Sequence, residues 1–267
     1  MRLHRGALGR ADEALELAVA YALLRGEAAR GDATVRIRRP AMPAVVFGRR
    51  DTRLPGFPAA VLAAREHGFT PLVRATGGRA VAYDDAALVV DHVSADPDPR
   101  AGHDRRFREF GTRMARIFRN LGIDARLGAV PGEYCPGAFS VNARGTAKLV
   151  GTSQRIVRNA WLFSSLVVVG GEHRLRPVLA EVYTHLGQPF DPASVGSLTS
   201  ELASLDTGIV ERALLADYQA AGGPDPEPLD PQPLAEPVLA LARELAGQYR
   251  IPDPAGITGS GAIADSE

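Results

Sequence analysis

The sequence predicts an α+β fold in which helices flank a mixed, largely antiparallel sheet. Two observations carry this prediction: long helical patterns stand beside short strands joined by tight turns, and the strict strand–helix–strand alternation of a parallel sheet is missing. The chain has 267 residues, of which 45% are hydrophobic, so it can bury a sizeable core. That length fits one large domain, or one domain with an appendage.

The N-terminal part of the chain begins with a helix. Asp12 precedes apolar residues at helical spacing and Gly31 follows them, which predicts a helix that starts and ends at these residues. Two short strands interrupted by prolines are predicted within residues 34–51, and a short helix closed by a glycine within 58–68. Residues 71–93 predict a strand, a glycine turn, a second strand, an acidic turn and a third strand.

The middle of the chain carries the strongest helical pattern. Residues 105–121 place their large apolar side chains on one stripe, and a glycine follows, which predicts an amphipathic helix. Residues 124–171 return to a strand-rich pattern, and residues 175–186 and 206–220 predict two more helices. These elements supply both the sheet and the helices that flank it.

The C-terminal segment differs in composition from the rest of the chain. Residues 222–237 carry six prolines, which is typical of a linker. A short amphipathic helix is predicted over 238–249, and a disordered tail over 253–267. We therefore divide the chain into a folded domain, residues 1–221, and an appendage, residues 222–267.

Charge and composition exclude several classes of protein. Lys plus Arg and Asp plus Glu number 31 each, so no bulk field favours a nucleic acid or an anionic membrane as partner. The one cysteine excludes an intramolecular disulfide and a multi-cysteine metal site, and we expect no metal. The N-terminus lacks the apolar core of a signal peptide, and no stretch approaches the roughly 18 apolar residues of a membrane span. We expect a cytoplasmic protein.

A first candidate for chemistry is the sequence Arg-Ala-Thr-Gly-Gly-Arg-Ala-Val, residues 74–81. Its adjacent glycines, Gly77 and Gly78, follow a predicted strand, where glycine allows left-handed backbone and the close approach of a ligand. A plain hairpin turn explains the same residues equally well.

A second candidate is Lys-Leu-Val-Gly-Thr-Ser-Gln-Arg, residues 148–155. If Lys148 points inward, its charge can polarise a carbonyl or stabilise a developing oxyanion. The alternative is an exposed lysine that guards the edge of a sheet.

Taken together, the two motifs resemble those of the lipoate–protein ligase A and octanoyltransferase family, in which they have the forms Arg-x-Ser-Gly-Gly-Gly-Ala-Val-x-His-Asp and Lys-x-x-Gly-Ser-Ala-Gln. The strand pattern Ala-Val-Val-Phe-Gly-Arg-Arg-Asp, residues 44–51, is also similar to the family's. The resemblance covers roughly residues 10–190 and implies a biotin/lipoyl-ligase-like catalytic domain over 1–221. In that fold the glycine loop and the lysine line a tunnel for a lipoyl or octanoyl chain.

The resemblance implies contacts to the acyl chain or substrate from both motifs. The residues are Arg74, Thr76, Gly77, Gly78, Arg79, Tyr83, Asp84, Gly151, Thr152 and Ser153. The chain departs from the family pattern where Arg79 replaces the third glycine, Tyr83 the histidine, and Ala86-Ala87 a Gly-Asn pair. These departures leave the tunnel in place and count against ligase-style handling of ATP.

The lone Cys135 lies in Tyr-Cys-Pro-Gly, residues 134–137, before Lys148. The same pattern resembles that of the family's amidotransferases, in which it implies a nucleophilic cysteine. A free thiol has a pKa near about 8.5, so it needs a group that stabilises the thiolate, and Lys148 is a candidate. The alternative is a buried structural thiol, although a Pro-Gly turn favours a surface or a cleft. His92 is another possible neighbour that sequence alone does not place.

The resemblance implies three functions to be separated. The first is an acyltransferase in which Cys135 and Lys148 are catalytic, with no cofactor, and which moves an octanoyl or lipoyl group to the lysine of a lipoyl domain. Its donor is an acyl carrier protein or a lipoyl-domain protein. The second is a lipoate–protein ligase that uses ATP and Mg, and the third is a non-catalytic protein that binds lipoyl domains.

Overall fold

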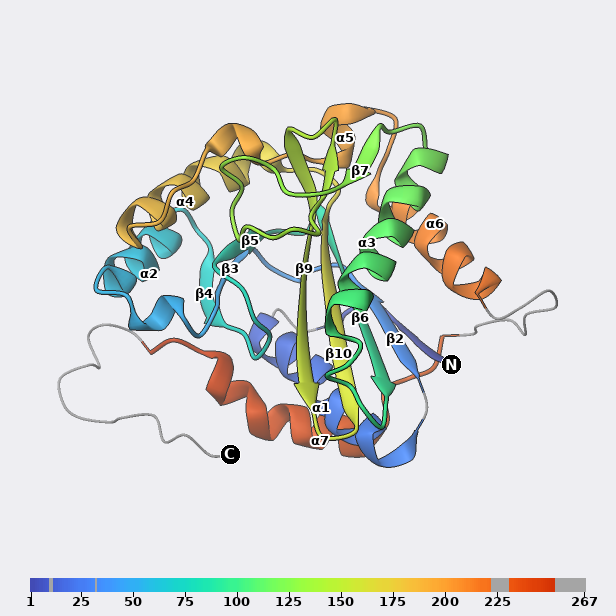
Figure 1. Ribbon diagram of the computed structural model, residues 1–267. Coiled ribbons are helices and arrows are strands. Elements are labelled where there is room, and N and C mark those ends of the chain that lie inside the picture. The colour runs from blue at the N-terminus through green and yellow to red at the C-terminus, as the bar shows by residue number, and fades with distance from the viewer. Residues whose placement is uncertain (10–11, 32, 222–230, 253–267) are drawn as a thin grey trace.

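The strands of the protein form two sheets (Figure 1). The computed structural model describes residues 1–9, 12–31, 33–221 and 231–252. The larger sheet contains, in spatial order, β1 (Arg2–Arg5), β2 (Thr34–Arg38), β6 (Ala87–Ala95), β10 (Ala160–Val168), β9 (Ala147–Val157), β8 (Val141–Ala143) and β7 (Ala125–Leu127). The smaller sheet contains β4 (Thr70–Val73), β3 (Ala44–Phe47) and β5 (Val81–Tyr83).

Both sheets are mixed and mostly antiparallel, as the sequence predicts. In the larger sheet β1 and β2 are parallel, whereas β2–β6, β6–β10, β10–β9, β9–β8 and β8–β7 are antiparallel. In the smaller sheet β3 is parallel to β4 and antiparallel to β5. The predicted fold class is confirmed.

Helices cover both faces of the larger sheet. They are α1 (Glu13–Arg30), α2 (Phe57–Glu66), α3 (His103–Asn120), α4 (Glu172–His185), α5 (Leu198–Glu201), α6 (Thr207–Ala220) and α7 (Glu236–Leu245), with 3-10 turns η1 (Asp51–Arg53), η2 (Pro192–Ser194) and η3 (Ala246–Tyr249). Leu88 and Val90 of β6 face a core that includes α3 and α6, while Val89 and Val93 face a core that includes α1 and α7. This alternation follows from the two-residue period of a strand. None of the described helices combines the length and apolar content needed to cross a bilayer.

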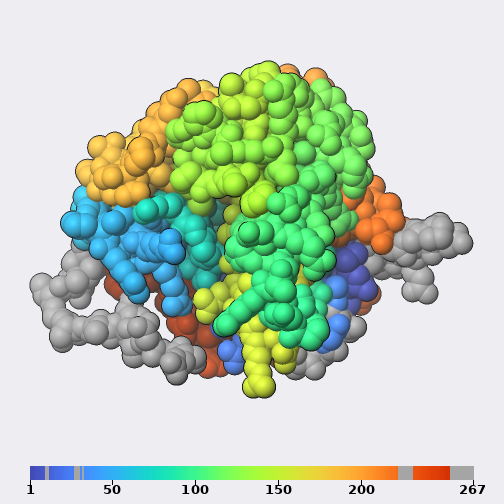
Figure 2. Space-filling view, viewed as in Figure 1, coloured from blue at the N-terminus to red at the C-terminus, as the bar shows by residue number. Residues whose placement is uncertain are grey.

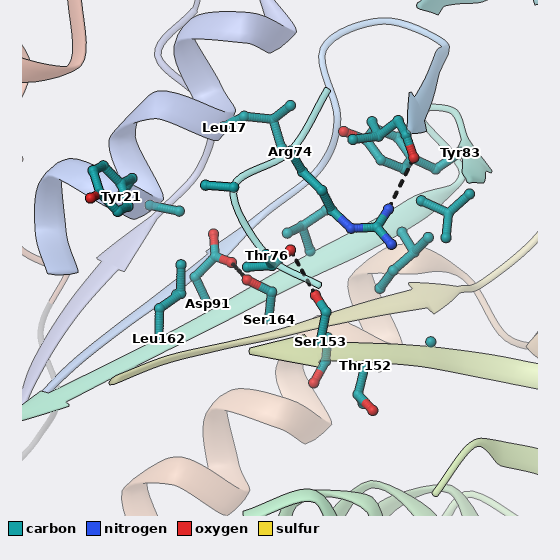
Figure 3. A pocket seen from close by; sticks show the side chains of 18 of the residues that line it. Leu17, Tyr21, Arg74, Thr76, Tyr83, Asp91, Thr152, Ser153, Leu162 and Ser164 are labelled. Carbon is teal, nitrogen blue, oxygen red and sulfur yellow. Dashed lines mark hydrogen bonds between the residues drawn. The ribbon is translucent and has the colours of Figure 1, made fainter. Parts of the chain in front are cut away.

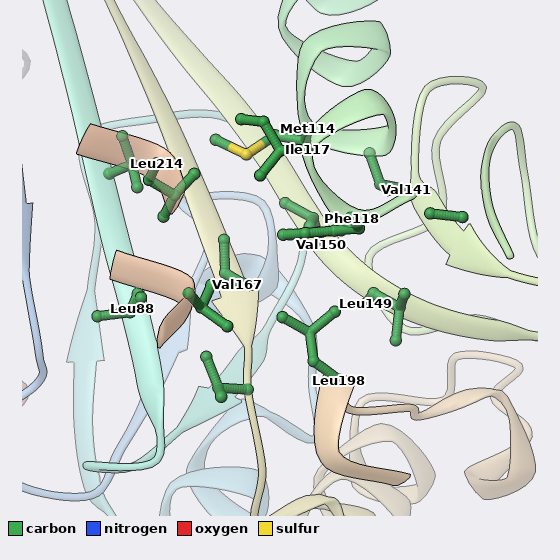
Figure 4. Packing of buried hydrophobic residues seen from close by; sticks show 14 of the residues in the cluster. Leu88, Met114, Ile117, Phe118, Val141, Leu149, Val150, Val167, Leu198 and Leu214 are labelled. Carbon is green, nitrogen blue, oxygen red and sulfur yellow. The ribbon is translucent and has the colours of Figure 1, made fainter. Parts of the chain in front are cut away.

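The helix α3 shows how the apolar stripe becomes packing. Met114, Ile117 and Phe118 point from α3 toward Val150 and Val167 of the sheet (Figure 4). The helix ends at Asn120, and Gly122 follows it with a φ of 95°, a conformation that glycine adopts at little cost. The predicted stripe and stop are confirmed.

The helix α1 also starts and ends where the sequence indicates. The side chain of Asp12 accepts a hydrogen bond from the backbone N–H of Leu15 at 3.1 Å, which caps the first turn. Gly31 follows the helix with a φ of 84°. The buried side chains of α1 include Ala18 and Val19, so the helix packs along the sheet on its apolar stripe.

The strands on either side of residues 74–80, the segment that we call the glycine motif, do not pair with each other. β4 and β5 lie on opposite sides of β3, so the segment 74–80 crosses the end of β3 instead of closing a hairpin. The plain hairpin turn is therefore wrong. Gly48, at the end of β3, makes the crossing possible, because a Cβ there would lie 1.9 Å from the carbonyl oxygen of Gly78.

The two chain ends add elements that the sequence indicates poorly. β1 is a short edge strand with charged residues, and it exists because it pairs with β2. α7 and η3 span 236–249, close to the expected helix, and they pack against α1 through side chains such as Val238 and Ala242. The division of the chain at residue 221 remains a prediction. Most of the predicted linker and the whole predicted tail lie outside the described residues.

Candidate active site

Cys135 lies in the loop between β7 and β8, in an unusual backbone conformation. Its φ is 44°, in the left-handed region that residues other than glycine rarely adopt. The loop is fixed there by Tyr183, whose hydroxyl accepts a hydrogen bond from the N–H of Cys135 at 2.6 Å and donates one to the carbonyl of Ala80 at 2.9 Å. A strained backbone of this kind persists only where surrounding contacts hold it in place, and such positions are common at functional sites.

The sulfur of Cys135 faces the glycine motif. The backbone N–H of Arg79 donates a hydrogen bond to Sγ at 3.1 Å, and Nη2 of Arg74 lies 3.8 Å from Sγ. Gly78 has a φ of 102°, and a Cβ at this position would lie 2.7 Å from Sγ. An N–H and a guanidinium at these positions interact more strongly with a thiolate than with a thiol. The motif therefore surrounds the sulfur with groups that favour a nucleophile.

Lys148 is buried beneath the Cys135 loop. Only 1% of it is exposed, so the exposed edge lysine is wrong. Its Nζ lies 2.8 Å from Oε2 of Glu133 and donates to the carbonyls of Tyr134 at 2.9 Å and of Cys135 at 2.8 Å. Three partners match the three N–H donors of an ammonium. Lys148 thus holds the backbone of Cys135, and its ammonium is directed at these three oxygens and not at the sulfur.

Glu133 is a site residue that the sequence analysis misses. It is 2% exposed, and its carboxylate accepts hydrogen bonds from the N–H of Val130 at 3.0 Å and the hydroxyl of Ser140 at 2.6 Å, besides pairing with Lys148. A buried charge is tolerated when it is paired and hydrogen-bonded in this way. The available signal was an acidic residue directly before Tyr-Cys-Pro-Gly, where a core position would normally be apolar.

Two cavities meet at Cys135. The first, which we call the acyl cavity, lies between α1, the glycine motif and the larger sheet (Figure 3). Its apolar lining comes from five elements: Leu17 of α1, Val46 of β3, Val81 of β5, Val89 of β6, and Leu162 and Leu166 of β10. Tyr21 and Tyr249 also line it, so the helix α1 and the C-terminal segment both contribute to the site.

The second cavity, which we call the open cleft, lies on the other side of Cys135. It is lined by Gly77, Gly78, His103, Phe107 and residues 136–140, among others. In Figure 2 the segments that border it meet near the middle of the face shown, where the surface is hollowed. Cys135, Thr152 and Ser153 line both cavities. The thiol therefore lies where a buried apolar space opens toward a cleft.

Most of the predicted binding residues come together around these cavities. Arg74 donates to the carbonyls of Val46 at 2.9 Å, Gly77 at 3.0 Å and Arg79 at 2.6 Å, so it fixes the course of the glycine motif. The residues that line at least one cavity are Arg74, Thr76, Gly77, Gly78, Tyr83, Gly151, Thr152 and Ser153. The hydroxyls of Ser153 and Thr76 are joined by a hydrogen bond of 3.0 Å, which ties β9 to the motif.

Three predicted positions need correction or refinement. The Arg79 side chain approaches Asp51 at 3.5 Å, and only its backbone N–H faces the sulfur. A Cβ at Gly77 would meet no atom within 4 Å, so space does not require glycine there. Asp84 lies outside both cavities, because its carboxylate accepts from the N–H of Ala86 at 3.0 Å and from Arg174 at 2.9 Å. Asp84 therefore organises the turn between β5 and β6 instead of contacting the cavity.

His92 is remote from the thiol. Its ring packs against Phe110, with ring centroids 5.0 Å apart, and against Trp161 on the face of β6 opposite to the acyl cavity. Burial, and then the charge of Arg113, lower the pKa of His92 to about 4. The ring is therefore neutral at physiological pH, and its place on the opposite face of β6 separates it from the cavity that Cys135 lines.

The acyl cavity also contains polar residues that the sequence analysis does not single out. Arg38, Asp91 and Ser164 line it from β2, β6 and β10. Arg38 and Asp91 are buried, and each directly follows a buried apolar residue of its strand, Ile37 and Val90 respectively. A charged residue within a predicted buried strand was the signal in the sequence that could have identified Arg38 and Asp91.

A family model covers most of the chain. The model of the lipoyl protein ligase A/B catalytic domain matches residues 12–219. This range contains the glycine motif, Cys135 and Lys148.

Curated relatives carry names from protein lipoylation. An octanoyl-[GcvH]:protein N-octanoyltransferase of Geobacillus kaustophilus is 28% identical over 191 residues, which is 67% of each chain. A protein of the same name from Anoxybacillus flavithermus is 32% identical over 127 residues, 48% of this chain and 45% of the relative. A lipoyl-[GcvH]:protein N-lipoyltransferase of Listeria monocytogenes is 23% identical over 54% of this chain and 52% of its own.

Solved structures share the fold. A lipoate-protein ligase A bound with ATP superposes with a TM-score of 0.72 at 21% identity, covering 92% of this chain and 94% of that one. A bipartite lipoate protein ligase from Thermoplasma acidophilum gives a TM-score of 0.70 at 20% identity, with 93% of each chain covered. At these identities the likeness speaks for the fold alone.

Proposed function

This chain belongs to the lipoyl protein ligase A/B catalytic domain family, and from its site we infer that it is an acyltransferase of protein lipoylation. It moves an octanoyl or lipoyl group through a thioester on Cys135 to the lysine of a lipoyl domain. The observation that carries this proposal is the position of Cys135, whose sulfur lies between an apolar cavity and an open cleft. A chain in the apolar cavity gains about 0.8 kcal/mol for each buried methylene.

The reaction consists of two exchanges at one carbonyl carbon. In the first, the Cys135 thiolate attacks the carbonyl of the acyl group on its donor, an S–C bond forms, and the donor group leaves with a proton. In the second, the amine of an acceptor lysine attacks the thioester, the C–S bond breaks, and an amide forms while the thiolate returns. The proton that this amine loses balances the one that the donor group took. When the donor is itself an acylated lysine, one amide replaces another, so the exchange needs no ATP or other cofactor.

The residues around the sulfur divide the work. The N–H of Arg79 and the guanidinium of Arg74 stabilise the thiolate before attack and after product release. Lys148 keeps Cys135 in its left-handed conformation and lines the open cleft. One of its N–H groups can turn from the Cys135 carbonyl to the oxyanion of the acyl group, which makes it the second catalytic residue.

Protein partners approach through the open cleft. The curated relatives are named for GcvH as acyl donor, and a lipoyl-domain protein of that kind is the donor we propose here, with an acyl carrier protein as the alternative donor. A lysine side chain is long and thin enough to enter between the glycine motif and residues 136–140. The acyl chain then extends away from the partner into the acyl cavity.

Intact-protein mass spectrometry tests the proposal directly. Incubation with octanoyl-GcvH in the absence of ATP should add one octanoyl mass to the wild-type protein, and hydroxylamine should remove it. Cys135→Ser should show no hydroxylamine-sensitive adduct and should not acylate an acceptor lipoyl domain. If Cys135→Ala still lipoylates the acceptor from free lipoate and ATP, the ligase function is correct and the thioester is not.

A further inference from the structure

One end of the acyl cavity is polar, although the rest of the lining is mostly apolar. We call this end, formed by Arg38, Asp91 and Ser164, the deep end. Arg38 is 1% exposed and Asp91 is 2% exposed, and both line the cavity together with Ser164. Figure 3 shows the Ser164 hydroxyl pointing at the Asp91 carboxylate, to which it donates a hydrogen bond of 2.5 Å. A cavity that only had to hold a hydrocarbon tail would have no use for buried groups of this kind.

Arg38 has a donor that the protein leaves unused. Its Nη2 donates to Oε1 of Glu13 at 2.6 Å, and its Nε lies 3.7 Å from Oε2 of Glu16, which is beyond hydrogen-bond distance. Nη1 has no hydrogen-bond partner among the described residues. A buried donor without an acceptor costs about 1–3 kcal/mol. Arg38 lines the cavity and its Nη1 is itself buried, so a ligand that supplies the missing acceptor must lie directly against the guanidinium.

The charges around Arg38, including the neighbouring carboxyl of Asp91, indicate which kind of acceptor fits there. Burial raises the pKa of Asp91 above its ordinary value, although the charge of Arg38 opposes this. The pairs Glu13–Arg38 and Glu16–Arg36 already balance each other in charge. The deep end therefore suits an uncharged acceptor better than a second carboxylate.

The strand register sets the distance from the thiol to this end. Ser153, which lines both cavities beside Cys135, is in register with Ser164, and Ser164 is in register with Asp91. Two strand spacings separate Ser153 from Asp91, a distance of about 10 Å. An extended eight-carbon chain has a comparable length. Its tail, and not its carbonyl, therefore reaches Asp91 and Arg38.

We infer that Nη1 of Arg38 is the donor of a subsite for a hydrogen-bond acceptor at the tail of the acyl chain, and that Asp91 and Ser164, already hydrogen-bonded to each other, form the wall of this subsite. The subsite selects chains whose last carbons carry oxygen or sulfur over methyl-terminated chains of the same length. A dithiolane sulfur and a terminal hydroxyl share this chemistry, the sulfur as the weaker acceptor. The inference rests on the proposed function only in taking the cavity as the site of the acyl chain.

Calorimetric titration with free acids tests the subsite without requiring transfer. The probes are octanoate, nonanoate as a control for length, 8-hydroxyoctanoate and lipoate. We expect 8-hydroxyoctanoate to bind about tenfold tighter than octanoate, with lipoate between them. A charged donor forms a stronger hydrogen bond with a hydroxyl oxygen than with a sulfur, which is a weak acceptor, and a methyl group forms none. Nonanoate should show no such gain, since it adds volume without an acceptor.

Two variants locate the effect. In Arg38→Met combined with Glu13→Gln, the preference for the hydroxyl tail should fall to about one, because the donor is gone and Glu13 is not left as a carboxylate without its partner. Arg5→Met combined with Glu211→Gln is the matched control, since it removes an ion pair that joins β1 to α6 away from the cavity. If the first double variant does not fold, Asp91→Asn offers a second test and should change the hydroxyl preference at least twofold.

The outcomes separate the subsite from the proposed function. Octanoate binding as tightly as 8-hydroxyoctanoate and lipoate in the wild-type protein overturns the subsite and leaves acyl transfer untouched. A hydroxyl preference that survives in the folded double variant, Arg38→Met with Glu13→Gln, also overturns the subsite and leaves acyl transfer untouched. Binding of none of the acids removes the acyl cavity itself, and the subsite falls together with the proposed function.

Discussion

Two buried ion pairs lie near Cys135 and the acyl cavity, one beneath the thiol loop and one at the deep end of the cavity, and they differ in how completely they are satisfied. At the thiol end, Lys148 has three acceptors around its ammonium, and Glu133 accepts from three further donors. At the deep end, Nη1 of Arg38 and Oε2 of Glu13 have no hydrogen-bond partner among the described residues. A saturated pair builds structure, whereas an unsaturated pair leaves binding capacity for something else. The comparison teaches that buried charge serves different purposes beneath the thiol loop and at the deep end of the cavity.

Removing the saturated cation should have the largest effect. In Lys148→Met the carboxylate of Glu133 stays buried without its counter-ion, and two loop carbonyls lose their donor. We expect the free energy of unfolding to fall by about 3–5 kcal/mol, and the rate of acyl transfer to fall about a hundredfold or more. Urea unfolding and single-turnover transfer assays measure the two effects. An unchanged transfer rate in folded Lys148→Met would contradict both of its proposed roles.

Replacing each pair as a unit sharpens the contrast. Lys148→Met with Glu133→Gln removes the buried charges but not the need of the loop carbonyls for a donor, so it should remain about 2 kcal/mol less stable than the wild type. Arg38→Met with Glu13→Gln should stay within about 1 kcal/mol of the wild type, or exceed it, because an incompletely satisfied pair contributes little. Equal losses of unfolding free energy in the two double variants would remove the distinction between the pairs.

The glycine motif allows a smaller, position-specific test at the thiol end. Gly78→Ala puts a methyl group in a left-handed backbone and against the sulfur of Cys135, which should cost about 1–3 kcal/mol and stop acylation of Cys135. Gly77→Ala is the matched control, because its Cβ would meet no atom within 4 Å. Mass spectrometry of the thioester compares them. Equal activity in the two variants would show that the motif does not constrain the sulfur.

Much of the fold was predictable because the signals are local. The Asp12 cap, the stop at Gly31 and the apolar stripe of α3 depend on residues within a few turns of one another, so the sequence displays them directly. The insertion of β3 between β4 and β5 is different. It depends on which strands pair, and no feature of the segment 71–83 distinguishes a hairpin from a crossing over the end of β3.

The site was predictable at its reactive atoms and less so at its supports. Cys135, Lys148 and Gly78 lie in motifs of small or reactive residues, and the structure brings all three together. Glu133 and Arg38 were missed because a buried charge is recognised only when its partner is known. Glu13 pairs with Arg38 from another element, 25 residues away in sequence, and such pairing is a property of the tertiary structure.

Asp91 provides the smallest expected effect, and its sign follows from the incomplete satisfaction of the deep end. Burial raises the pKa of Asp91 above 3.8, with the charge of Arg38, the hydrogen bond from Ser164 and the charge of Arg36 opposing and the charge of Glu16 assisting. The native state therefore holds this proton more tightly than the unfolded chain does. As pH rises from below 3.8, the unfolded chain releases the proton first, so this carboxyl lowers stability until its native pKa is passed, and the loss then persists.

Asp91→Asn removes this dependence while preserving the size of the side chain. The free energy of unfolding of Asp91→Asn relative to the wild type should therefore increase between about pH 4 and about pH 7. Urea unfolding of both proteins across this range measures it, and Asp98→Asn, at an exposed turn, controls for the loss of a carboxylate. If the difference stays constant or declines with pH, then the charges of Arg36 and Arg38 outweigh burial. Asp91 would then be a satisfied anion, like Glu133 at the thiol end, and the contrast between the two ion pairs would rest on Arg38 and Glu13 alone.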